Sequence, residues 1–582
     1  MTIRAERSLP TDASHREFTI LVNGEEVPRE QPLVSLRVSN LANRVASARL
    51  VYADGVASSG DFPLSNQSLF APGAEVQIRA GGSNRADLLF HGVIVRQALK
   101  VRAGTSPQLH VECRHAAFRM TLQRRNRNHF DCRDSEVIED LVGAAQLPCD
   151  VEATTVQHAQ LVQCDASDWD FVVVRAAANG QAVVTRDDRL VVMAPSASAD
   201  PVVALQYGAT LIELDAELDA RLQVESVATV RWDAADQSVA LEDAQAPGFA
   251  GPGNLAPGDL ADAIESGPLT LHHQLTGAEE ARMLAQAHWR ARQVDKVRGR
   301  LYCDGLGQVR PGDVVDVQGI GERFSGQVWI SGVLHEMDLA RGWKTHLQFG
   351  SVALDESLAQ RLSRPRATAM VATVPGLQVG IVTDIEDPQG EERVRIRLPL
   401  VDAGDDGVWA RLASPDAGPQ RGWVFRPEPG DEVVVGFFDD DPRLPVVLGM
   451  LHSSARPAPH AADADNPRKG LLTRSGLRLL FDDEGKSVTL ATPEGRELRL
   501  GDDDAAMTLS DGNGNRLVLD DSGITLESRG AIRIRAGGDA SLESDASLRI
   551  KAGGELSAES SSTAKVQASA ALTLKGSTVL IN

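Results

Sequence analysis

Aromatic residues, cysteines and long apolar runs are all scarce in this chain of 582 residues. Phe, Trp and Tyr make up only 4% of it, so a core must be built mainly from aliphatic side chains. The five cysteines are scattered and form no CxxC pair, which is typical of plain core residues in a protein made in a reducing compartment; they are Cys113, Cys132, Cys149, Cys164 and Cys303. No uninterrupted apolar run of about 18 residues occurs, so the sequence predicts no transmembrane helix.

Positive charge is also in short supply. The 59 Lys and Arg residues face 81 Asp and Glu residues, and the net charge of −22 argues against a nucleic-acid or anionic-membrane surface. The first residues contain no apolar segment of a secretory signal peptide, so we expect synthesis in the cytoplasm and export, if any, by another route. Alternating apolar segments with Gly turns recur throughout, which indicates a largely β protein of about four domains.

What the chain has instead is a repeat of eight residues. Aligned from Ser522, the octads read SGITLESR, GAIRIRAG, GDASLESD, ASLRIKAG, GELSAESS, STAKVQAS and AALTLKGS, followed by TVLIN. Their third and fifth places hold mostly Ile, Leu or Val with a polar residue between, which predicts a short strand with one buried face. The larger of these side chains, predicted to form a shared core, are Ile524, Leu526, Ile532, Ile534, Leu542, Leu548, Ile550, Leu556, Val566, Leu572 and Leu574.

One octad cannot stabilise itself. Fixing eight residues costs about 8 to 16 kcal/mol of backbone entropy, whereas burying two modest apolar side chains returns about 3 to 6 kcal/mol. The deficit shrinks if several identical ladders share one dry axis, and an intertwined three-sided β-prism is the simplest closed arrangement. A single-chain parallel β-helix is the alternative, although its coils need roughly twenty residues.

The first 370 residues or so read as strands with a few helices. Residues 18–27 predict a hairpin that turns at Asn23-Gly24. Residues 167–180 predict a helix with a capping box at Ser167 and a stop at Gly180. Thr276 with Glu279 predicts the start of a second helix that runs through about residue 293.

This region also contains signs of a diverged duplication. Residues 72–78, 90–95 and 109–111 resemble residues 311–317, 324–330 and 345–349, and in both copies a Pro-Gly turn opens the series. The pattern predicts two similar β-barrels, and three chains would then place six barrels around an axis, which could match a sixfold partner. Chance convergence of Pro-Gly turns is the alternative.

Residues 371–451 contain five short apolar segments, which suit an OB-like barrel. Its most distinctive sequence motifs are PEPGDEVVVGFF at 427–438 and DDPRLPVVLG at 440–449. With RPGDVVDV, WISGVLHEMD and the octads, these stretches resemble VgrG-type trimeric spike proteins of contractile injection systems, which are related to the tailed-phage baseplate hub and spike. The resemblance covers nearly the whole chain. SDWDFVVVRAAANGQ at 167–181 favours phage-tail-like extracellular injection particles over type VI secretion, and both stay open.

The resemblance implies a mainly β fold with hub-like β-barrels, an OB-fold barrel and an intertwined trimeric β-helix or prism. The expected domains are a phage-hub-like domain with two similar barrels at 1–370, an OB-fold spike base at 371–451, a linker at 452–469 and a trimeric needle at 470–582. The function implied is a structural hub and spike that pierces a membrane mechanically and is delivered outside the cell, with no effector domain following the needle.

The partners implied are a second and third copy of the chain, a hexameric tube protein at the N-terminal barrels, baseplate proteins and a PAAR-type tip protein. The residues expected to dock the tip are Val579, Leu580, Ile581 and Asn582. The competing function is a glycan- or receptor-binding tail spike, with or without polysaccharide-degrading activity, for which the OB region offers Trp409, Trp423 and Phe425.

Several short motifs imitate catalytic or metal sites. Gly485-Lys486-Ser487 lacks the rest of a phosphate-binding loop, and residues 511–515 lack the Gly and Glu of a calcium loop, so both are interpreted as hairpin turns. His335-Glu336 and His272-His273 lack further ligands and are interpreted as packing or surface residues. The sequence therefore predicts no catalytic residue, cofactor or metal, although its many carboxylates leave open an unmarked acid pair on a prism face.

Overall fold

The computed structural model describes residues 18–81, 86–233, 238–249, 251–273, 277–350, 374–401, 403–404 and 406–581. The chain divides into two compact units, Met1–Pro375 with Asp439–Pro442 and Gly376–Phe438 with Arg443–Asn582. Strands take up 41% and helices 12% of the described residues, so the prediction of a mainly β protein is confirmed. The predicted boundary between residues 370 and 371 lies outside the described residues.

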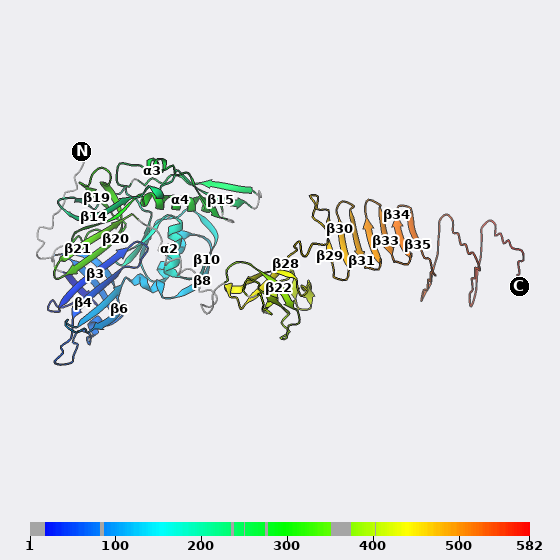
Figure 1. Ribbon diagram of the computed structural model, residues 1–582, viewed down its shortest axis with the longest axis horizontal. Helices are drawn as coiled ribbons and strands as arrows, with labels where there is room; N and C mark the ends of the chain where they lie inside the picture. The colour runs from blue at the N-terminus through cyan, green and yellow to red at the C-terminus, as the bar shows by residue number, and fades with distance from the viewer. Residues whose placement is uncertain are drawn as a thin grey trace. The chain divides into compact units, whose positions relative to one another are not determined.

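The first unit is built on a large sheet whose first half comes from residues 18–114 (Figure 1). Its strands are β1 (Phe18–Val22), β2 (Glu25–Glu26), β3 (Leu33–Leu41), β4 (Ser47–Ala53), β5 (Glu75–Ala80), β6 (Asp87–Lys100) and β7 (Gln108–Arg114). They lie in the order β2-β1-β5-β6-β7-β4-β3 around an aliphatic core that includes Leu36, Leu50 and Val111. The predicted hairpin turn at Asn23-Gly24 is confirmed, since both residues have the positive φ that such turns require.

The second half of this sheet repeats the strand order of the first. Its strands are β13 (Val203–Gln206), β14 (Leu211–Leu218), β18 (Val297–Asp304), β19 (Val314–Gln318), β20 (Gly326–Asp338) and β21 (Gly342–Phe349). They lie in the order β13-β19-β20-β21-β18-β14, which matches β1-β5-β6-β7-β4-β3 strand for strand. A second aliphatic core includes Leu301, Val315 and Leu347. The copies differ at one end, because β13 runs parallel to β19 whereas β1 runs antiparallel to β5.

The two copies also share their turn geometry. Gly73 and Gly312 both have positive φ, and their N–H groups donate to the carbonyls of Ile94 and Ile330 at 2.8 and 2.7 Å. The N–H groups of Ile94 and Ile330 donate back to the turns at 2.9 and 2.8 Å. A β-bulge follows each isoleucine. The resemblance read from the sequence therefore extends to matching backbone hydrogen bonds.

The two halves are joined edge to edge. β20 extends past its pairing with β19 and pairs antiparallel with β3, from Gly332 opposite Leu41 to Asp338 opposite Ser35. Arg37 and Glu336 form an ion pair of 3.3 Å across this junction. Figure 1 shows β3, β4, β20 and β21 side by side. The halves keep separate cores but form one continuous sheet, whereas the sequence predicts two similar barrels.

Residues 124–193 form a helical layer with its own core. Its elements are β8 (Arg124–Arg133), α1 (Asp134–Ala144), β9 (Cys149–Val151), β10 (Gln157–Ser167), α2 (Asp168–Ala178), β11 (Ala182–Arg186) and β12 (Arg189–Met193). The core includes Leu141, Trp169 and Val172. The predicted helix start is confirmed, because Ser167 Oγ accepts a hydrogen bond of 3.1 Å from the Asp170 N–H. Gly180, which has positive φ, follows the helix end.

A further group of elements lies between β14 and β18 in the sequence. They are β15 (Val227–Asp233), β16 (Ser238–Asp243), α3 (Pro257–Ala263), β17 (Leu269–His273) and α4 (Ala278–Val294). The N-cap of α4 is Gly277, and Thr276, where the sequence places the helix start, lies outside the described residues. In the described part of the chain, no helix is long and apolar enough to cross a membrane.

The second unit begins with a closed barrel. It is formed by β22 (Gln378–Asp384), β23 (Arg393–Arg397), β24 (Val408–Leu412), β28 (Pro445–Met450) and β27 (Glu432–Phe437), in that order. Inward-facing Val382, Ile396 and Val435 are fully or almost fully buried in its core. A short hairpin of β25 (Ala417–Gly418) and β26 (Arg421–Gly422) leaves the barrel wall. The predicted OB-like barrel is therefore confirmed.

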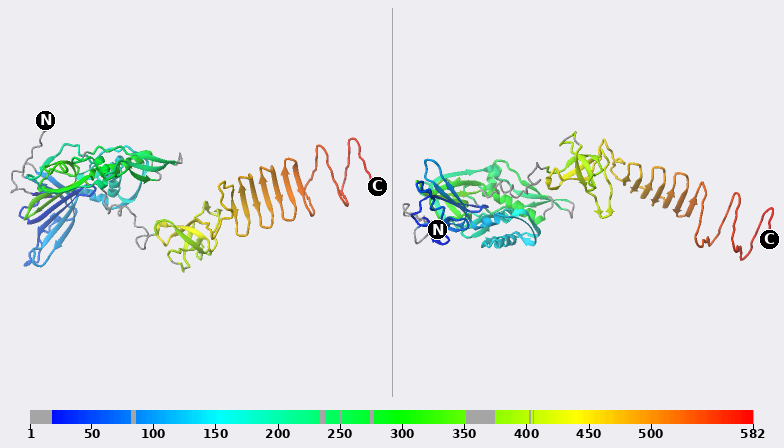
Figure 2. Two further views of the ribbon diagram at one scale, coloured as in Figure 1. Left: turned by 45° about the horizontal axis from the view of Figure 1, so that its top comes forward. Right: turned by 90° about the horizontal axis from the view of Figure 1, so that it is seen from below.

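A ladder of short antiparallel strands follows the barrel in sequence (Figure 2). The strands are β29 (Arg468–Leu472), β30 (Arg478–Asp482), β31 (Ser487–Ala491), β32 (Glu497–Gly501), β33 (Ala506–Ser510), β34 (Arg516–Asp520) and β35 (Gly523–Glu527). Each pairs with the strand before it and the strand after it. The strands form a meander, because tight turns between short strands place each strand beside the next one in the sequence.

The octads continue after β35 as wide arches (Figure 1). Bends recur every eight residues, at 529–530, 537–538, 545–546, 553–554, 561–562 and 569–570, so the period seen in the sequence is present in the backbone. Within residues 528–581 the structure assigns no strand, whereas the sequence predicts one per octad. The physical reason is that successive octads do not pair with each other, and a strand needs a neighbouring backbone.

Candidate functional site: the apolar face of the C-terminal ladder

One face of the ladder is almost entirely apolar. Cross-strand pairing aligns a first row of seven leucines within β29–β35, namely Leu471, Leu479, Leu490, Leu498, Leu509, Leu517 and Leu526. A second row starts at Lys469 and continues with Phe481, Val488, Leu500, Met507, Leu519 and Ile524. Because residues two apart on a strand point to the same side, the two rows share one face.

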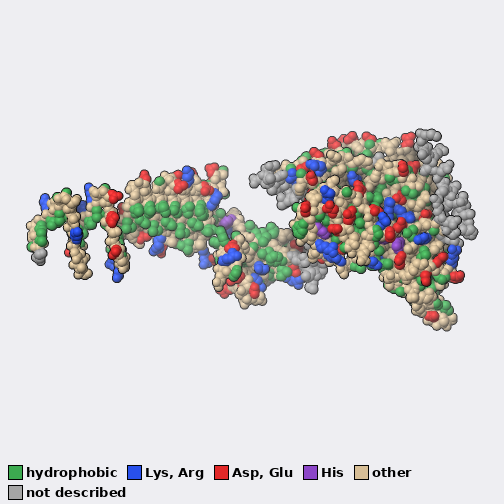
Figure 3. Space-filling model, turned by 180° about the vertical axis from the view of Figure 1, so that it is seen from behind, with side chains coloured by type: hydrophobic (Ala, Val, Ile, Leu, Met, Phe, Trp, Pro, Cys, Tyr) green, Lys and Arg blue, Asp and Glu red, His purple; other side chains and the backbone are tan. Residues whose placement is uncertain are grey.

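This apolar face is open in the single chain. Leu509, near its middle, is 53% exposed, and most members of both rows are at least one-third exposed. Figure 3 shows the face as a continuous band of hydrophobic side chains along the ladder. A contiguous apolar surface of this kind is typical of a protein interface. The apolar face is therefore the strongest candidate for a functional surface.

The opposite face of the ladder is mostly polar. Its central row contains Thr489, Arg499, Thr508 and Thr525. An outer row contains cross-strand ion pairs, including Arg516 with Glu527 at 2.7 Å. A sheet with one polar and one apolar face is built to keep one side in water and to bury the other.

The turns at the ladder's edge are polar and tightly hydrogen-bonded. Oδ1 of Asp511 accepts hydrogen bonds of 2.9 Å from the N–H groups of Asn513 and Asn515. These bonds, with the Asn515 side chain, lower the pKa of Asp511 to about 2. Residues 511–515 form the hairpin turn between β33 and β34, and Gly485 and Lys486 lie in the hairpin turn that ends where Ser487 begins β31, so both motifs lie at turns, as predicted. In the described part of the chain, no cluster of side chains could hold a metal ion.

The predicted core residues divide into two groups. Ile524 and Leu526 lie on the apolar face of β35 and end its two rows. The remaining predicted residues, from Ile532 to Leu574, lie in the octads and are at least half exposed, with Ile534 reaching 86%. Since the octads repeat the spacing of Ile524 and Leu526, they prolong the same two-row pattern along the chain.

The predicted tip residues lie past the last octad bend. Leu580 and Ile581 are 88% and 82% exposed, and Val579 is half exposed. Asn582 lies outside the described residues.

Sequence reasoning missed the part of the apolar face between Leu471 and Leu519. Its signal was an apolar pair two residues apart that recurs about every nine or ten residues, as in Leu479/Phe481 and Val488/Leu490. The spacing exceeds eight because each antiparallel turn needs extra residues, so these pairs do not align with the octads.

The other candidate residues have structural roles or exposed positions. His335 is buried, its Nδ1 lies 3.0 Å from Thr345 Oγ1, and burial together with the Arg310 charge lowers its pKa to about 3. It is a packing residue, as predicted. The side chains of His272, His273 and Cys164 lie outside the described residues. Cys113, Cys132, Cys149 and Cys303 are thiols.

The barrel presents one exposed aromatic pair. The rings of Trp423 and Phe425 lie 5.8 Å apart and are about half exposed, whereas Trp409 lies under the guanidinium of Arg393. Exposed rings of this kind are the feature that a sugar-binding surface would use.

Curated relatives match parts of the chain. The chain is 34% identical over 103 residues to the type VI secretion system spike protein VgrG4b of Pseudomonas aeruginosa, covering 17% of this chain and 12% of that protein. It is 27% identical over 154 residues to VgrG1b of the same organism, covering 25% and 20%. It is 29% identical over 130 residues to VgrG3 of Vibrio cholerae, covering 19% and 13%. The matched stretches thus span a fifth or less of the relatives' lengths.

Solved structures are distantly similar. A tail protein from Neisseria meningitidis MC58 covers 58% of this chain and 97% of its own, with 13% identity and a TM-score of 0.43. An E. coli protein described as a component of the type VI secretion system covers 74% and 99%, with 13% identity and a TM-score of 0.39. A chain of the Francisella PdpA–VgrG complex covers 88% and 80%, with 9% identity and a TM-score of 0.38.

Two family models match along the chain. Residues 12–338 match the Alg8 N-terminal domain, and this stretch contains most of both half-sheets. Residues 378–452 match the type VI secretion system/phage-baseplate injector OB domain, which coincides with the closed barrel. Because the first model covers more than half of the chain, the chain belongs to the Alg8 N-terminal-domain family, and the injector OB domain together with the VgrG relatives identifies it as a VgrG-type spike protein.

Proposed function

We propose that this protein is the structural hub and spike of a contractile injection apparatus and that it works as a homotrimer. The observation that carries the proposal is the open apolar face of β29–β35. A monomer would leave two rows of mostly aliphatic side chains exposed to water, and each buried Leu or Ile would otherwise contribute about 1.5 to 3 kcal/mol.

Three copies of the ladder can bury this face completely. Each strand has five residues, so each sheet is a ribbon only about 17 Å wide. Three such ribbons can turn their apolar faces to one axis and form a triangular prism, with polar turns at the three corners. The result is a narrow, stiff needle whose polar outer faces are solvated.

The octads support an intertwined continuation of this prism. Their backbone groups have no strand partner within residues 528–581, and such groups must be paired or hydrated. Wide arches of one chain leave room for strands of two other chains to enter between successive octads. Pairing between chains would then turn each octad into a strand, with Ile534, Leu548 and their equivalents facing the axis.

The repeated half-sheet supports a hub that binds a hexameric tube. Three chains contribute six half-sheets with the same strand order, so a threefold protein could present a nearly sixfold surface to a hexameric tube protein. Baseplate proteins are the expected partners around this hub. A PAAR-type tip protein is the expected partner of residues 579–582.

The mode of action proposed is mechanical rather than enzymatic. The needle pierces a target membrane when the apparatus contracts, and the chain is thereby delivered outside the cell. The second candidate is a glycan-binding spike, favoured by exposed Trp423 and Phe425. Glycan-array binding by the full-length chain that disappears in Trp423→Ala would support this second candidate, whereas an array without signal would oppose it.

The test of the proposal is the mass of the purified chain in solution. Light scattering after size exclusion should give three times the chain mass of 62.2 kDa for the full-length protein. A truncation that ends at Pro467 removes the ladder and octads. The truncated chain should be monomeric or form a much weaker trimer. A well-folded full-length monomer would contradict the shared axis, and a dimer would contradict the three-sided prism.

A further inference from the structure

A polar cleft lies between α4 and the helical layer of the first unit. Its volume is about 390 Å³. One wall is a single face of α4, formed by Glu279, Arg282, Met283, Gln286 and Arg290. The opposite wall is formed by residues 152–156 and by Asn179 and Gln181 at the end of α2. The proposed spike function assigns no role to these residues.

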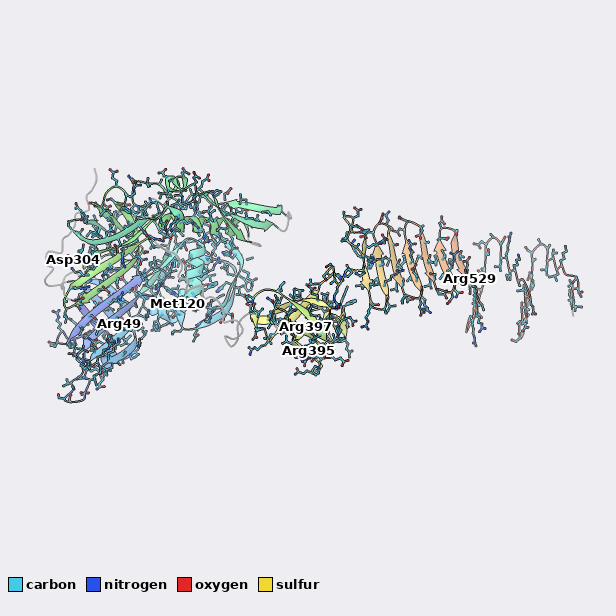
Figure 4. All side chains as sticks on the ribbon, in the orientation of Figure 1. Arg49, Met120, Asp304, Arg395, Arg397 and Arg529 are labelled. Carbon is cyan, nitrogen blue, oxygen red and sulfur yellow. The ribbon has the colours of Figure 1, made fainter. Side chains whose placement is uncertain are left out.

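Both walls of the cleft are held in place by packing. The helical layer has a dense core, in which Met120, labelled in Figure 4, is 3% exposed. Thr154 is tied to the start of α1, because its N–H donates to Ser135 Oγ at 3.2 Å and the Ser135 N–H donates to Thr154 Oγ1 at 3.1 Å. The helix α4 approaches the end of α2 so closely that a Cβ atom added to Gly180 would lie 3.1 Å from the Cα of Ala287. The cleft is therefore formed without a ligand.

The wall at residues 152–156 has a strand-like edge. Burial alternates from Ala153 to Val156, as it does along a strand with one buried face. The N–H groups of Glu152 and Thr154 donate to other parts of the helical layer at 2.9 and 3.2 Å. Among the described residues, the N–H and C=O groups of Ala153 and Thr155 have no hydrogen-bond partner. Because alternate residues of an extended chain direct their backbone groups to opposite edges, these free groups share one edge.

Two charges of the α4 wall are uncompensated. In the part of the chain that the structure describes, neither half-buried Arg290 nor Glu279 in the first turn forms an ion pair or a side-chain hydrogen bond. Arg282, between them, is compensated by Glu242 at 2.7 Å. A partly buried guanidinium is stabilised by a carboxylate that it can contact through two hydrogen bonds. The Arg290 end of the cleft is therefore suited to an anionic group.

A buried hydrogen-bond acceptor lies at the same end. Gln181 is only 7% exposed, and its Nε2 donates to the carbonyl of Glu152 at 3.0 Å. Its Oε1 is buried and receives no hydrogen bond from the described residues. Gln181 follows Gly180, whose Cβ position lies 3.7 Å from the Cδ of Arg290. Since a buried acceptor without a donor is destabilising, a ligand that brings an N–H group as well as an anion would suit this end.

We propose that the cleft binds an extended peptide segment of about five residues, which adds as a strand to the edge at Ala153 and Thr155 and places a carboxylate against Arg290. Glu279 and Arg290 are about three helical turns apart, or roughly 16 Å along the axis. An extended peptide of about five residues spans the same length. In such strand addition the main chain supplies affinity and alternate side chains supply specificity.

The chemistry of the partner follows from the two ends of the cleft. The peptide carries a carboxylate, from Asp, Glu or a chain terminus, at the Arg290 end. A basic side chain at its other end pairs with Glu279. The partner is therefore a protein with an exposed, extended segment that is acidic at one end and basic at the other. Binding of this segment does not depend on the proposed trimer.

An array of random hexapeptides, probed with the full-length chain, tests the proposal. The wild-type chain should select peptides with a carboxylate at one end, and in anisotropy titrations Arg290→Gln should bind the selected peptides at least ten-fold more weakly. Arg300→Gln is the matched control, because Arg300 is 74% exposed on β18 and does not line the cleft. An array without selected peptides, or equal affinities of wild type and Arg290→Gln, would overturn the proposal.

N-methylation of the selected peptide tests the backbone contact with the protein unchanged. Because an added strand uses every second N–H group, methylation at alternate residues should weaken binding about ten-fold, and methylation at the residues between them should have little effect. A uniform effect along the peptide, or equally tight binding of free glutamate, would contradict strand addition. A chain that is monomeric by light scattering but binds the peptide would overturn the proposed spike and leave this inference intact.

Discussion

At the scale of single residues, Asp134 shows how a buried charge is held in this fold. It is fully buried at the start of α1, where its carboxylate accepts hydrogen bonds from Arg175 Nε at 2.5 Å and from Asn179 Nδ2 at 2.8 Å. His158 Nε2 lies 3.0 Å from the same carboxylate. Burial alone would raise the pKa of Asp134, but the hydrogen bonds and the charge of Arg175 outweigh it and hold the pKa below its usual value.

Replacing Arg175 should therefore destabilise the first unit strongly. In Arg175→Met the carboxylate stays buried without its partner, which costs about 3 to 5 kcal/mol of unfolding free energy. The measurement is the urea midpoint at pH 7 by tryptophan fluorescence. Arg189→Met is the matched control, because Arg189 pairs with Asp150 on the exposed surface and its loss should leave the midpoint unchanged. Equal midpoints for the two variants would contradict this account of Asp134.

The same residue predicts a pH dependence. Because the pKa of Asp134 is lower in the folded chain than in the unfolded one, its contribution is fully present above the unfolded value of about 3.9. The contribution is lost as the pH falls through the folded value. The difference in urea midpoint between the wild-type chain and Asp134→Asn should thus be largest near neutral pH and shrink in acid. A difference that stays constant down to pH 3 would show that the charge is not its origin.

At the scale of elements, neighbouring residues of β33 lie on opposite faces of the ladder, so the same substitution should have opposite effects on the trimer at the two positions. Leu509→Asp places a charge on the apolar face, whereas Thr508→Asp places it on the polar face. In a monomer both substitutions would be tolerated, because Leu509 is already 53% exposed. In a trimer only Leu509→Asp should lower the mass and the melting temperature, since it would bury three carboxylates at one axis.

The octads permit the same test where the structure assigns no strands. Ile534→Asp and Leu548→Asp should also weaken the trimer. Arg533→Asp should not, because Arg533 would face outward once its octad forms a strand in the trimer. Light scattering at decreasing protein concentration measures the effect. Unchanged trimers in Ile534→Asp would contradict the axial position of the octad side chains.

Elements specified by local chemistry could be predicted from the sequence. The Ser167 cap, the Asn23-Gly24 turn and the barrel strands depend on neighbouring residues, and the structure has them. The apolar face of the ladder was predicted only from Ile524 onward, because an octad alignment skips pairs spaced by nine or ten residues.

At the scale of the whole chain, pairing between distant segments could not be predicted. β3 and β20 are about 300 residues apart, and nothing in either sequence specifies that their edges meet. Their charges become informative only once the pairing is known, because Arg37 and Glu336 are ordinary surface residues when read alone.

The two ends of the needle should be separable in function. Deleting residues 579–582 removes highly exposed Leu580 and Ile581 but leaves every paired strand of the ladder and every octad core position in place. The shortened chain should therefore keep the trimeric mass and the melting temperature of the full-length protein, while losing binding to a PAAR-type tip protein in a calorimetric titration. The truncation at Pro467 is the contrasting variant, because it should lose both properties. Undiminished tip binding after removal of 579–582 would move the docking surface back along the needle, to the outer faces of the octads.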